Sequence, residues 1–399
     1  MITVLEKSTC SGCSACVAAC PKQCIKMEID IEGFSYPVVD QSKCVNCGIC
    51  DKTCPIRNPR SESPFKQESY VVQNRDKHVL AESTAGGAFT AIAKYVIKNG
   101  GVVFGAVLDD NLTVHHDCVN SEADLKRLRN SKYVQSFIGG TLNHVKSFLR
   151  QGKMVCFSGT PCQVEGLKRF LGKEYENLIT VDVVCRAVPS PMVFSKYLEL
   201  QERRLGSKVR NIRFRDKHYG YKYSTMNVTT DNNKGKYHQG VESDPWLRAF
   251  FSGLCLRPSC YDCKFKKRYR VSDFTIWDCF AVGRYSKELD NDKGATRLLI
   301  HTDIGRDIFK KISSEFIFEK IDPERIIEGT AEMFSCVEYN SRRELFMKDA
   351  AELDSEVLFN KYFPNTMKSK AEHAVRMICY KVGVYGFAKK IYVKLTDKY

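Results

Sequence analysis

The stretches CSGCSACVAACP at residues 10–21 and CVNCGICDKTCP at residues 44–55 decide the fold of the N-terminal part of the chain. Both have the spacing C-x2-C-x2-C-x3-C-P. Three cysteines this close on one loop reach three corners of a 4Fe-4S cluster, and the fourth ligates the cluster of the other run. The spacing therefore predicts two 4Fe-4S clusters with crossed ligand sets, Cys10, Cys13, Cys16 and Cys54 for one and Cys20, Cys44, Cys47 and Cys50 for the other.

The segment around these runs predicts a small α+β ferredoxin domain over residues 1–57. Residues 24–29 and 35–39 have the pattern of a hairpin that turns at residues 32–33. A pair of zinc knuckles is the alternative, but zinc sites prefer two pairs of ligands to a repeated three-plus-one pattern. The polar, proline-bearing residues 57–64 are typical of a linker.

The composition favours metal binding over disulfides. The chain has 399 residues and 19 cysteines, and nine of these cysteines precede residue 55. No apolar run is long enough to span a membrane, and the first twenty residues lack the apolar core of a secretory signal. We therefore expect a reducing, cytoplasmic location, where cysteines bind metals more often than they form disulfides.

The net charge of +15 indicates a basic surface. Each 4Fe-4S cluster with four thiolates carries about −2, which lowers this excess without abolishing it. A basic surface attracts acidic partners, and an acidic redox donor such as ferredoxin is the one we expect. Because no nucleic-acid-binding motif is present, no nucleic-acid partner is expected.

Strands and helices alternate through residues 68–340, which predicts an α/β layered domain. Strands are predicted at residues 70–72, 101–107, 154–158 and 178–184. Helices are predicted at residues 83–98, 142–150 and 162–171, and from Pro191 to about residue 205.

Two segments of this domain are candidate binding sites. In STAGGA, residues 83–88, paired glycines open a helix whose free N–H groups could meet a phosphate or a flavin; close packing is the alternative. In GTPCQ, residues 159–163, Thr160 suits the N-cap and Cys162 falls in the first helical turn, where a thiolate is favoured. Cys185 follows the next strand. If the two strands are parallel, both cysteines emerge at one edge of the sheet as nucleophiles or metal ligands; two structural cysteines are the alternative.

A third cysteine group, Cys255-x4-Cys260-x2-Cys263, lies in a loop-like stretch rich in Cys, Pro and Lys. Three cysteines at close spacing predict a third 4Fe-4S cluster, with its fourth ligand supplied by Cys185 or Cys162. Structural zinc is the competing interpretation. About twelve iron atoms per chain would indicate three clusters, whereas about eight with zinc would indicate the alternative.

Several motifs stand in an order that resembles the coenzyme F-420 hydrogenase/dehydrogenase beta-subunit family over about residues 70–340. They are residues 83–93, 131–136, 157–163, 184–191, 260–266 and 272–273. The resemblance implies an iron–sulfur flavoprotein in which the central domain is a layered flavin-binding domain. The residues it implies for FAD are Ser83, Gly86, Gly87, Lys132, Thr160 and Gln163.

The chain departs from the family pattern at two motifs. The usual Val-Cys-His-Gly reads VCRA at residues 184–187, and the usual Gly-Asp-Phe-Trp-Gly reads WDCFA at residues 277–281. The first change removes any role of the histidine. In the second, Asp278 remains and the glycines do not, which leaves the substrate open.

Residues 341–399 are predicted to form a helical, basic tail. A helix is expected over residues 341–359, and a basic, aromatic stretch follows Pro364, with Val382, Val384, Tyr385, Phe387, Ile391, Tyr392, Val393 and Leu395 among Lys381, Lys389, Lys390 and Lys394. Such a segment either docks on the core or lies on an anionic membrane at its inner face.

Together these patterns predict an oxidoreductase. Electrons would enter from a low-potential donor, cross the clusters, and reduce FAD and then a small-molecule substrate. The family resemblance implies a substrate of surface polysaccharide synthesis or coenzyme F-420. No catalytic residue is identified. The alternative is a non-catalytic electron-transfer subunit of a larger redox complex.

Overall fold

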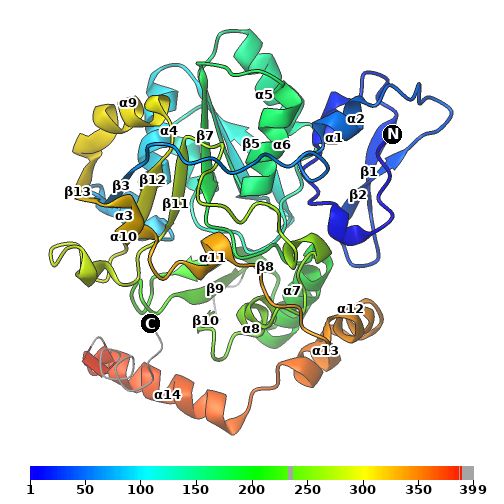
Figure 1. Ribbon diagram of the computed structural model, residues 1–399. Helices are drawn as coiled ribbons and strands as arrows, with labels where there is room; N and C mark the ends of the chain where they lie inside the picture. The colour runs from blue at the N-terminus through cyan, green and yellow to red at the C-terminus, as the bar shows by residue number, and fades with distance from the viewer. Residues whose placement is uncertain (232–236, 386, 389–399) are drawn as a thin grey trace.

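The computed structural model describes residues 1–231, 237–385 and 387–388. Its N-terminal domain lies at one side of the molecule (Figure 1). The expected hairpin forms from β1 (Ile25–Ile29) and β2 (Ser35–Val39), which are antiparallel. Two short helices, α1 (Ala15–Ala19) and α2 (Ile49–Thr53), each end at the fourth cysteine of their run. The proline that follows cannot continue either helix.

The central domain is built on a mixed eight-stranded sheet with the strand order β13-β3-β12-β11-β7-β6-β4-β5. The neighbours β11, β7, β6 and β4 are parallel, as an α/β domain requires, and the flanking strands pair antiparallel. The strands are β3 (Glu68–Asn74), β4 (Val102–Leu108), β5 (Val114–Val119), β6 (Val155–Gly159), β7 (Leu178–Val183), β11 (Phe274–Asp278), β12 (Thr296–Ile300) and β13 (Phe316–Ile321).

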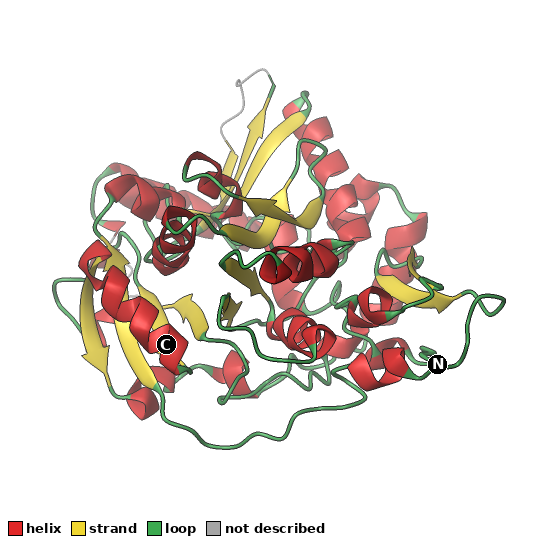
Figure 2. Cartoon of the chain, turned by 90° about the horizontal axis from the view of Figure 1, so that it is seen from above, coloured by secondary structure: helices red, strands yellow, loops and turns green. Residues whose placement is uncertain are grey.

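Helices cover both faces of this sheet (Figure 2). α4 (Ala88–Lys98) and α9 (Asp303–Ile312) pack on one face, in a core that includes Val103 of β4. α5 (Thr141–Arg150) and α6 (Pro161–Leu171) pack on the other face, in a core that includes Val102. Successive strand residues therefore point to opposite cores. Short helices complete the domain, namely α3 (Lys77–Glu82), α10 (Pro323–Ile327) and α11 (Ala331–Phe334).

A second, smaller sheet has the order β10-β9-β8, with β8 (Val209–Asp216), β9 (Thr225–Thr230) and β10 (Tyr237–Gln239). It packs with α7 (Pro191–Leu205) and α8 (Pro245–Ser252) around an aromatic core that contains Tyr197 and Trp246. The 3-10 turns of the chain are η1 (Lys7–Thr9), η2 (Ala123–Leu128), η3 (Pro258–Cys260), η4 (Val282–Arg284) and η5 (Ser313–Glu315).

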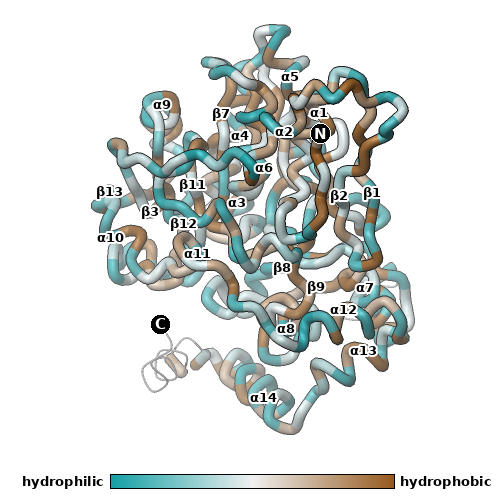
Figure 3. Tube along the Cα trace, turned by 45° about the vertical axis from the view of Figure 1, so that its right-hand side comes forward, coloured by the Kyte–Doolittle hydropathy of each residue, from teal (hydrophilic) through white to brown (hydrophobic). Residues whose placement is uncertain are grey.

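The C-terminal region differs from the single helix predicted over residues 341–359. It forms α12 (Arg343–Glu352) and α13 (Ser355–Tyr362), because the chain becomes extended at Leu353 and the Asp354 side chain caps the second helix. α14 (Met367–Lys381) follows at the periphery of the molecule and alternates between apolar and polar residues (Figure 3). The part of the predicted basic tail at residues 389–399 lies outside the described residues. No helix in the described part of the chain combines the length and apolarity needed to cross a membrane.

The N-terminal domain packs directly on the central domain. α1 contacts α6 and α5, and α2 contacts α6. The predicted linker also lies on the central domain: Arg169 donates to the carbonyl of Asn58, and Lys267 donates to the carbonyl of Arg60 at 2.9 Å. Glu62 accepts from the backbone N–H groups of residues 268 and 269. Hydrogen bonds at residues 58, 60 and 62 therefore fix the predicted linker on the central domain.

Candidate functional site

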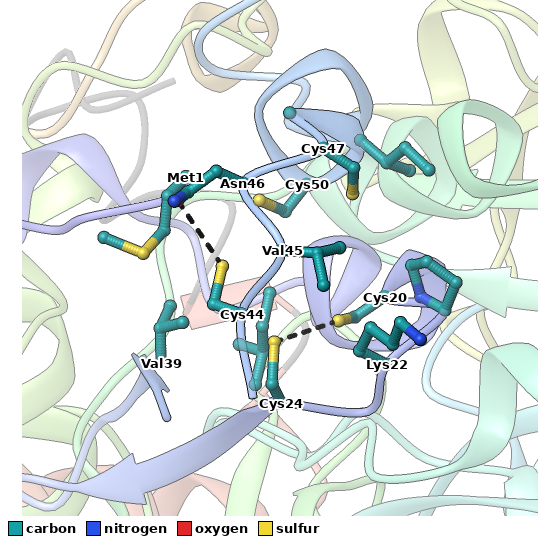
Figure 4. Close-up of a pocket in the computed structure, with 14 residues that line it drawn as sticks. Met1, Cys20, Lys22, Cys24, Val39, Cys44, Val45, Asn46, Cys47 and Cys50 are labelled. Carbon is teal, nitrogen blue, oxygen red and sulfur yellow. Dashed lines mark hydrogen bonds between the residues drawn. The ribbon is translucent and has the colours of Figure 1, made fainter. Parts of the chain in front are cut away.

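Four of the predicted ligands, Cys20, Cys44, Cys47 and Cys50, line one cavity of the N-terminal domain; we call them the outer cysteine set (Figure 4). The backbone N–H of Ile2 donates to Cys50 Sγ at 3.2 Å, and Cys47 is exposed to solvent. Cys24, which belongs to neither predicted ligand set, lies 3.4 Å from Cys20 Sγ at the same cavity. The outer set brings together one crossed group of predicted ligands near the surface.

The other crossed group is Cys10, Cys13, Cys16 and Cys54; we call it the inner cysteine set, because Cys10 and Cys13 contact the central domain at Arg257 and at α6. Burial, with smaller contributions from the nearby thiolates of Cys10, Cys162 and Cys54, raises the pKa of Cys13 to about 12. Cys13 packs against Gly166 of α6, where an added Cβ would lie 2.9 Å from the Cys13 Sγ. The glycine thus permits the close approach of this set to α6.

Four further cysteines, Cys162, Cys185, Cys260 and Cys263, line a second cavity; we call them the third cysteine set. The cavity has an empty volume of about 890 Å³, including space open to solvent. Cys162 stands in the first turn of α6 and Cys185 follows β7. Because β6 and β7 are parallel neighbours, both cysteines lie at the same edge of the sheet.

Cys255, the remaining cysteine of the predicted Cys255-x4-Cys260-x2-Cys263 group, is not among the residues that line this cavity. It is fully buried in the aromatic core with Leu254 and Leu256, and it does not line the cavity. The strand-like pairing of Leu256 with Pro189, and the bond from Ser190 N–H to the Cys255 carbonyl, direct this stretch into the core. The flanking leucines are the sequence signal that could have indicated this.

The thiols of the third set need a metal to become thiolates. Burial raises the pKa of Cys162, Cys185 and Cys260 to about 12, and neighbouring thiolates act in the same direction. Bound iron would displace these protons, since only thiolates ligate it. Among the described residues, no three His, Cys, Asp or Glu side chains converge closely enough to share a single metal ion.

Cationic side chains surround this cavity. Lys266 Nζ donates to the carbonyl of Cys185 at 2.6 Å, and Arg270 lies 3.1 Å from the buried carboxylate of Asp182. Burial raises the pKa of that carboxyl group, and Arg270 opposes the rise. A cationic rim stabilises an anionic group such as a thiolate-ligated 4Fe-4S cluster, so the donor set and its surroundings fit that group.

Arg257 reaches from this cavity to the inner cysteine set. Its side chain is fully buried and lines the third cavity. Nε donates to the carbonyl of Cys10 at 2.7 Å, and a terminal nitrogen lies 3.6 Å from Cys10 Sγ. The other terminal nitrogen donates to Gln135 Oε1 at 2.8 Å, and the guanidinium stacks over the Tyr36 ring at 4.4 Å. Sequence reasoning missed this residue because burial of one arginine leaves no pattern.

The residues that the family resemblance implies for FAD lie in two places. Ser83, Gly86 and Gly87 precede α4, whereas Thr160 and Gln163 form a capping box at the start of α6. The Gly86 N–H already donates to Thr296, and an added Cβ there would lie 2.3 Å from a β3 carbonyl oxygen. The Ser83 hydroxyl donates to the backbone of α3. These contacts join the turn that precedes α4 to strands β3 and β12 and to helix α3.

Positive charge gathers beside the first of these places. Lys217 and Arg213 donate to backbone carbonyls within residues 80–85, and Lys132 donates to the carbonyls of Arg127 and Arg129. Burial lowers the pKa of both lysines to about 7. Carbonyl oxygens already accept from these cations, and an anion bound beside them would favour the protonated form of both lysines.

The comparisons with known proteins agree with the motifs. Residues 152–325 match the family model for the C terminus of the coenzyme F420 hydrogenase/dehydrogenase beta subunit, and residues 9–58 match the 4Fe-4S dicluster domain. A search of curated proteins finds no match. A chain of the F420-reducing NiFe hydrogenase complex from Methanosarcina barkeri, solved as a xenon derivative, is 18% identical with a TM-score of 0.44; the match covers 75% of this chain and 94% of that one. The two family-model matches agree with the predicted resemblance: residues 152–325 match the coenzyme F420 hydrogenase/dehydrogenase beta-subunit model, and the 4Fe-4S dicluster match lies in front of them.

Proposed function

We propose that the chain is an iron–sulfur flavoprotein oxidoreductase that carries electrons from an acidic, low-potential donor to FAD and a small-molecule substrate. The observation that supports this most is the succession of three four-cysteine sets, from the outer set through the inner set to the third set at the start of α6. Cys47 of the outer set is exposed, Cys13 of the inner set packs on α6, and Cys162 of the third set begins α6. When bound, the clusters would supply one-electron steps and FAD would supply two-electron chemistry.

The third cysteine set is the proposed ligand set of a third 4Fe-4S cluster. Its support is the shared cavity, the sulfur donors and the cationic rim. The test is iron and acid-labile sulfide per chain. Wild-type protein should hold about twelve iron atoms, and Cys260→Ala about eight. Cys255→Ala, a buried cysteine outside the cavity, is the matched control and should retain about twelve. Eight iron atoms with one zinc ion in the wild type would contradict the proposal.

The outer cysteine set is the proposed entry point for an acidic donor such as ferredoxin. Val45 and Ile49 line its cavity and are 57% and 39% exposed. Lys22 and Lys52 are exposed beside them. An apolar centre with a cationic rim suits an acidic electron carrier.

The test for donor entry is the double variant Lys22→Glu/Lys52→Glu. It should raise KM for reduced ferredoxin by roughly tenfold at low salt and leave kcat unchanged, since rim charges act mainly on encounter. Lys98→Glu, on the sheet face opposite to α6, is the control. An unchanged KM in the double variant would exclude this entry point.

FAD is proposed beside the start of α4, in the region to which Lys132, Lys217 and Arg213 bring positive charge. This charge fits the diphosphate of FAD, whereas Ser83 and Gly86 are already engaged in backbone contacts.

Purified protein should contain flavin whose absorbance bleaches with reduced ferredoxin. Flavin-free protein with intact clusters would instead indicate a non-catalytic electron-transfer subunit. Reoxidation of the reduced protein by coenzyme F-420, or by a nucleotide-linked sugar of polysaccharide synthesis, would identify the substrate class.

We also propose that α14 lies on the inner face of an anionic membrane. Val375, Ile378 and Val382 form a stripe on one face and are 59%, 59% and 63% exposed. The opposite side is docked, with Arg376 over the Tyr223 ring at 4.5 Å. The exposed lysines of α14 flank the stripe, namely Lys368, Lys370 and Lys381. An apolar stripe with lysines is the pattern of an interfacial helix.

Vesicle flotation tests this contact. The full chain should float with vesicles that contain anionic lipid and remain in solution with neutral vesicles. The double variant Val375→Glu/Ile378→Glu should lose flotation, while Lys98→Glu should retain it. Equal flotation of both variants, or no flotation of the wild type, would contradict the proposal.

A further inference from the structure

Arg257 is a buried cation without a carboxylate partner among the described residues. Its side chain is fully buried, and its hydrogen bonds go to the carbonyls of Cys10 and Ser35 and to the amide oxygen of Gln135. A buried charge that is paired only with neutral acceptors is costly unless a negative group lies nearby. We therefore expect an anionic group close to the Arg257 guanidinium.

Two other arginines beside the same sites show the usual arrangement. Arg343 is also buried, but it is bidentate to the Glu32 carboxylate at 3.0 and 2.6 Å. Arg270 pairs with Asp182. Of these three arginines, Arg257 is the one whose charge no carboxylate compensates, and it is the one that reaches both the inner set and the third cavity.

We propose that Arg257 is the shared counter-ion of the inner and third clusters, a positioning residue that raises the reduction potential of both. This inference rests on the proposed function. Each thiolate-ligated cluster is an anion, and its one-electron reduction adds one more negative charge. The guanidinium remains protonated throughout. It therefore stabilises the reduced form of each cluster more than the oxidised form.

The contacts indicate why one residue can serve both sites. The Nε atom and one terminal nitrogen face Cys10, whose carbonyl and thiol they reach at 2.7 and 3.6 Å. The backbone of Arg257 pairs with the carbonyl of Val188 at 2.9 Å, and Cys260 N–H in turn bonds to the Arg257 carbonyl. The same residue thus holds the loop of the third set while its side chain extends to the inner set.

The test is an EPR-monitored redox titration of the full-length holoprotein. Arg257→Gln keeps a hydrogen-bonding side chain and removes the charge. It should make reduction of both the inner and the third cluster about tenfold less favourable, which for a one-electron couple is about 59 mV. Signals are assigned with Cys13→Ala, Cys260→Ala and Cys47→Ala. The outer cluster should keep its potential, because Arg257 does not line its cavity.

Two control variants separate the effect of the Arg257 charge from other effects of substitution at this interface. Arg257→Lys retains the charge. The equilibrium constant for reduction of each of the two clusters should therefore stay within threefold of the wild-type value. Arg343→Gln, at the same interface but paired with Glu32, should leave both unchanged. A folded Arg257→Lys protein with potentials as low as those of Arg257→Gln would overturn the proposal. So would a shift confined to one cluster. The iron count of the wild type separately decides the proposed function.

Discussion

The outer and inner cysteine sets carry the same motif in opposite surroundings. In both runs the second residue after the first cysteine adopts a left-handed backbone, Gly12 with φ 72° and Asn46 with φ 52°. A Cβ at Gly12 would meet Gln135 and Arg257 at 2.8 and 2.9 Å, whereas Asn46 carries its side chain in solvent. The same motif supplies both sets of predicted ligands, and contact with the central domain is what distinguishes the surroundings of the inner set from those of the outer set.

The largest effect should come from filling the contact between the inner set and α6. Gly166→Val would press against Cys13, and overpacking of this kind costs about 1–3 kcal/mol. We expect a lower melting temperature and loss of about four iron atoms, since Cys13 is a proposed ligand. Lys168→Ala on the same helix, which removes the ion pair with the exposed Glu174 at 2.7 Å, is the control. Full iron content in Gly166→Val would show that the two sets are not distinguished by this contact.

Exchanging the paired turn residues tests the comparison directly. Gly12→Asn should destabilise the protein by about 1–2 kcal/mol, because the new side chain meets Arg257 and Gln135. The reverse change, Asn46→Gly, should alter stability by less than about 1 kcal/mol, since the site is exposed and glycine accepts its backbone. Chemical denaturation of the holoprotein measures both. Equal effects would remove the distinction between the two runs.

Exposure should also set the order in which the clusters are lost. Cys47 is exposed, while Cys13 is 8% exposed. Brief treatment with ferricyanide should therefore abolish the EPR signal of the outer cluster several-fold faster than that of the inner cluster, because susceptibility follows access. Simultaneous loss would mean that burial does not protect the inner set.

The smallest effect is expected at the apolar contacts of the outer cavity. Val45→Ser with Ile49→Ser should raise KM for reduced ferredoxin about two- to threefold, because small apolar contacts at an interface contribute little individually. Phe334→Ser, which changes an apolar residue 49% exposed on α11, serves as the control. A larger effect than that of the lysine variants would make apolar burial the main source of donor affinity.

Local patterns were sufficient for much of the fold. The pattern of residues 101–107 predicted a strand, which the structure has at Val102–Leu108, and Thr160 with Pro161 predicted the start of α6. The break at Leu353 was missed, because an extended residue followed by an aspartate cap is compatible with a continuous apolar pattern. The antiparallel flanks of the sheet depend on long-range pairing that no local pattern encodes.

In the candidate site, too, local patterns predicted some features, whereas others depend on contacts between distant segments. Cys162 and Cys185 were placed at one sheet edge from chain order and from the carboxyl ends of two strands, and β6 and β7 are indeed parallel neighbours. Cys255 was grouped with Cys260 and Cys263 by spacing alone, yet its side chain turns into the aromatic core. Arg257 could not be found, since its contact with Cys10 joins two segments almost 250 residues apart that meet only in the folded chain.

The held linker has a consequence for kinetics. Residues 58, 60 and 62 are bound by Arg169, Lys267 and the backbone of residues 268 and 269. The N-terminal domain is therefore fixed on the central domain, and under the proposed function we expect electrons to pass through it without movement of the domain between donor and acceptor. Internal electron delivery should depend on the spacing set by α6 and be insensitive to solvent viscosity, so that only the encounter with the donor is controlled by diffusion.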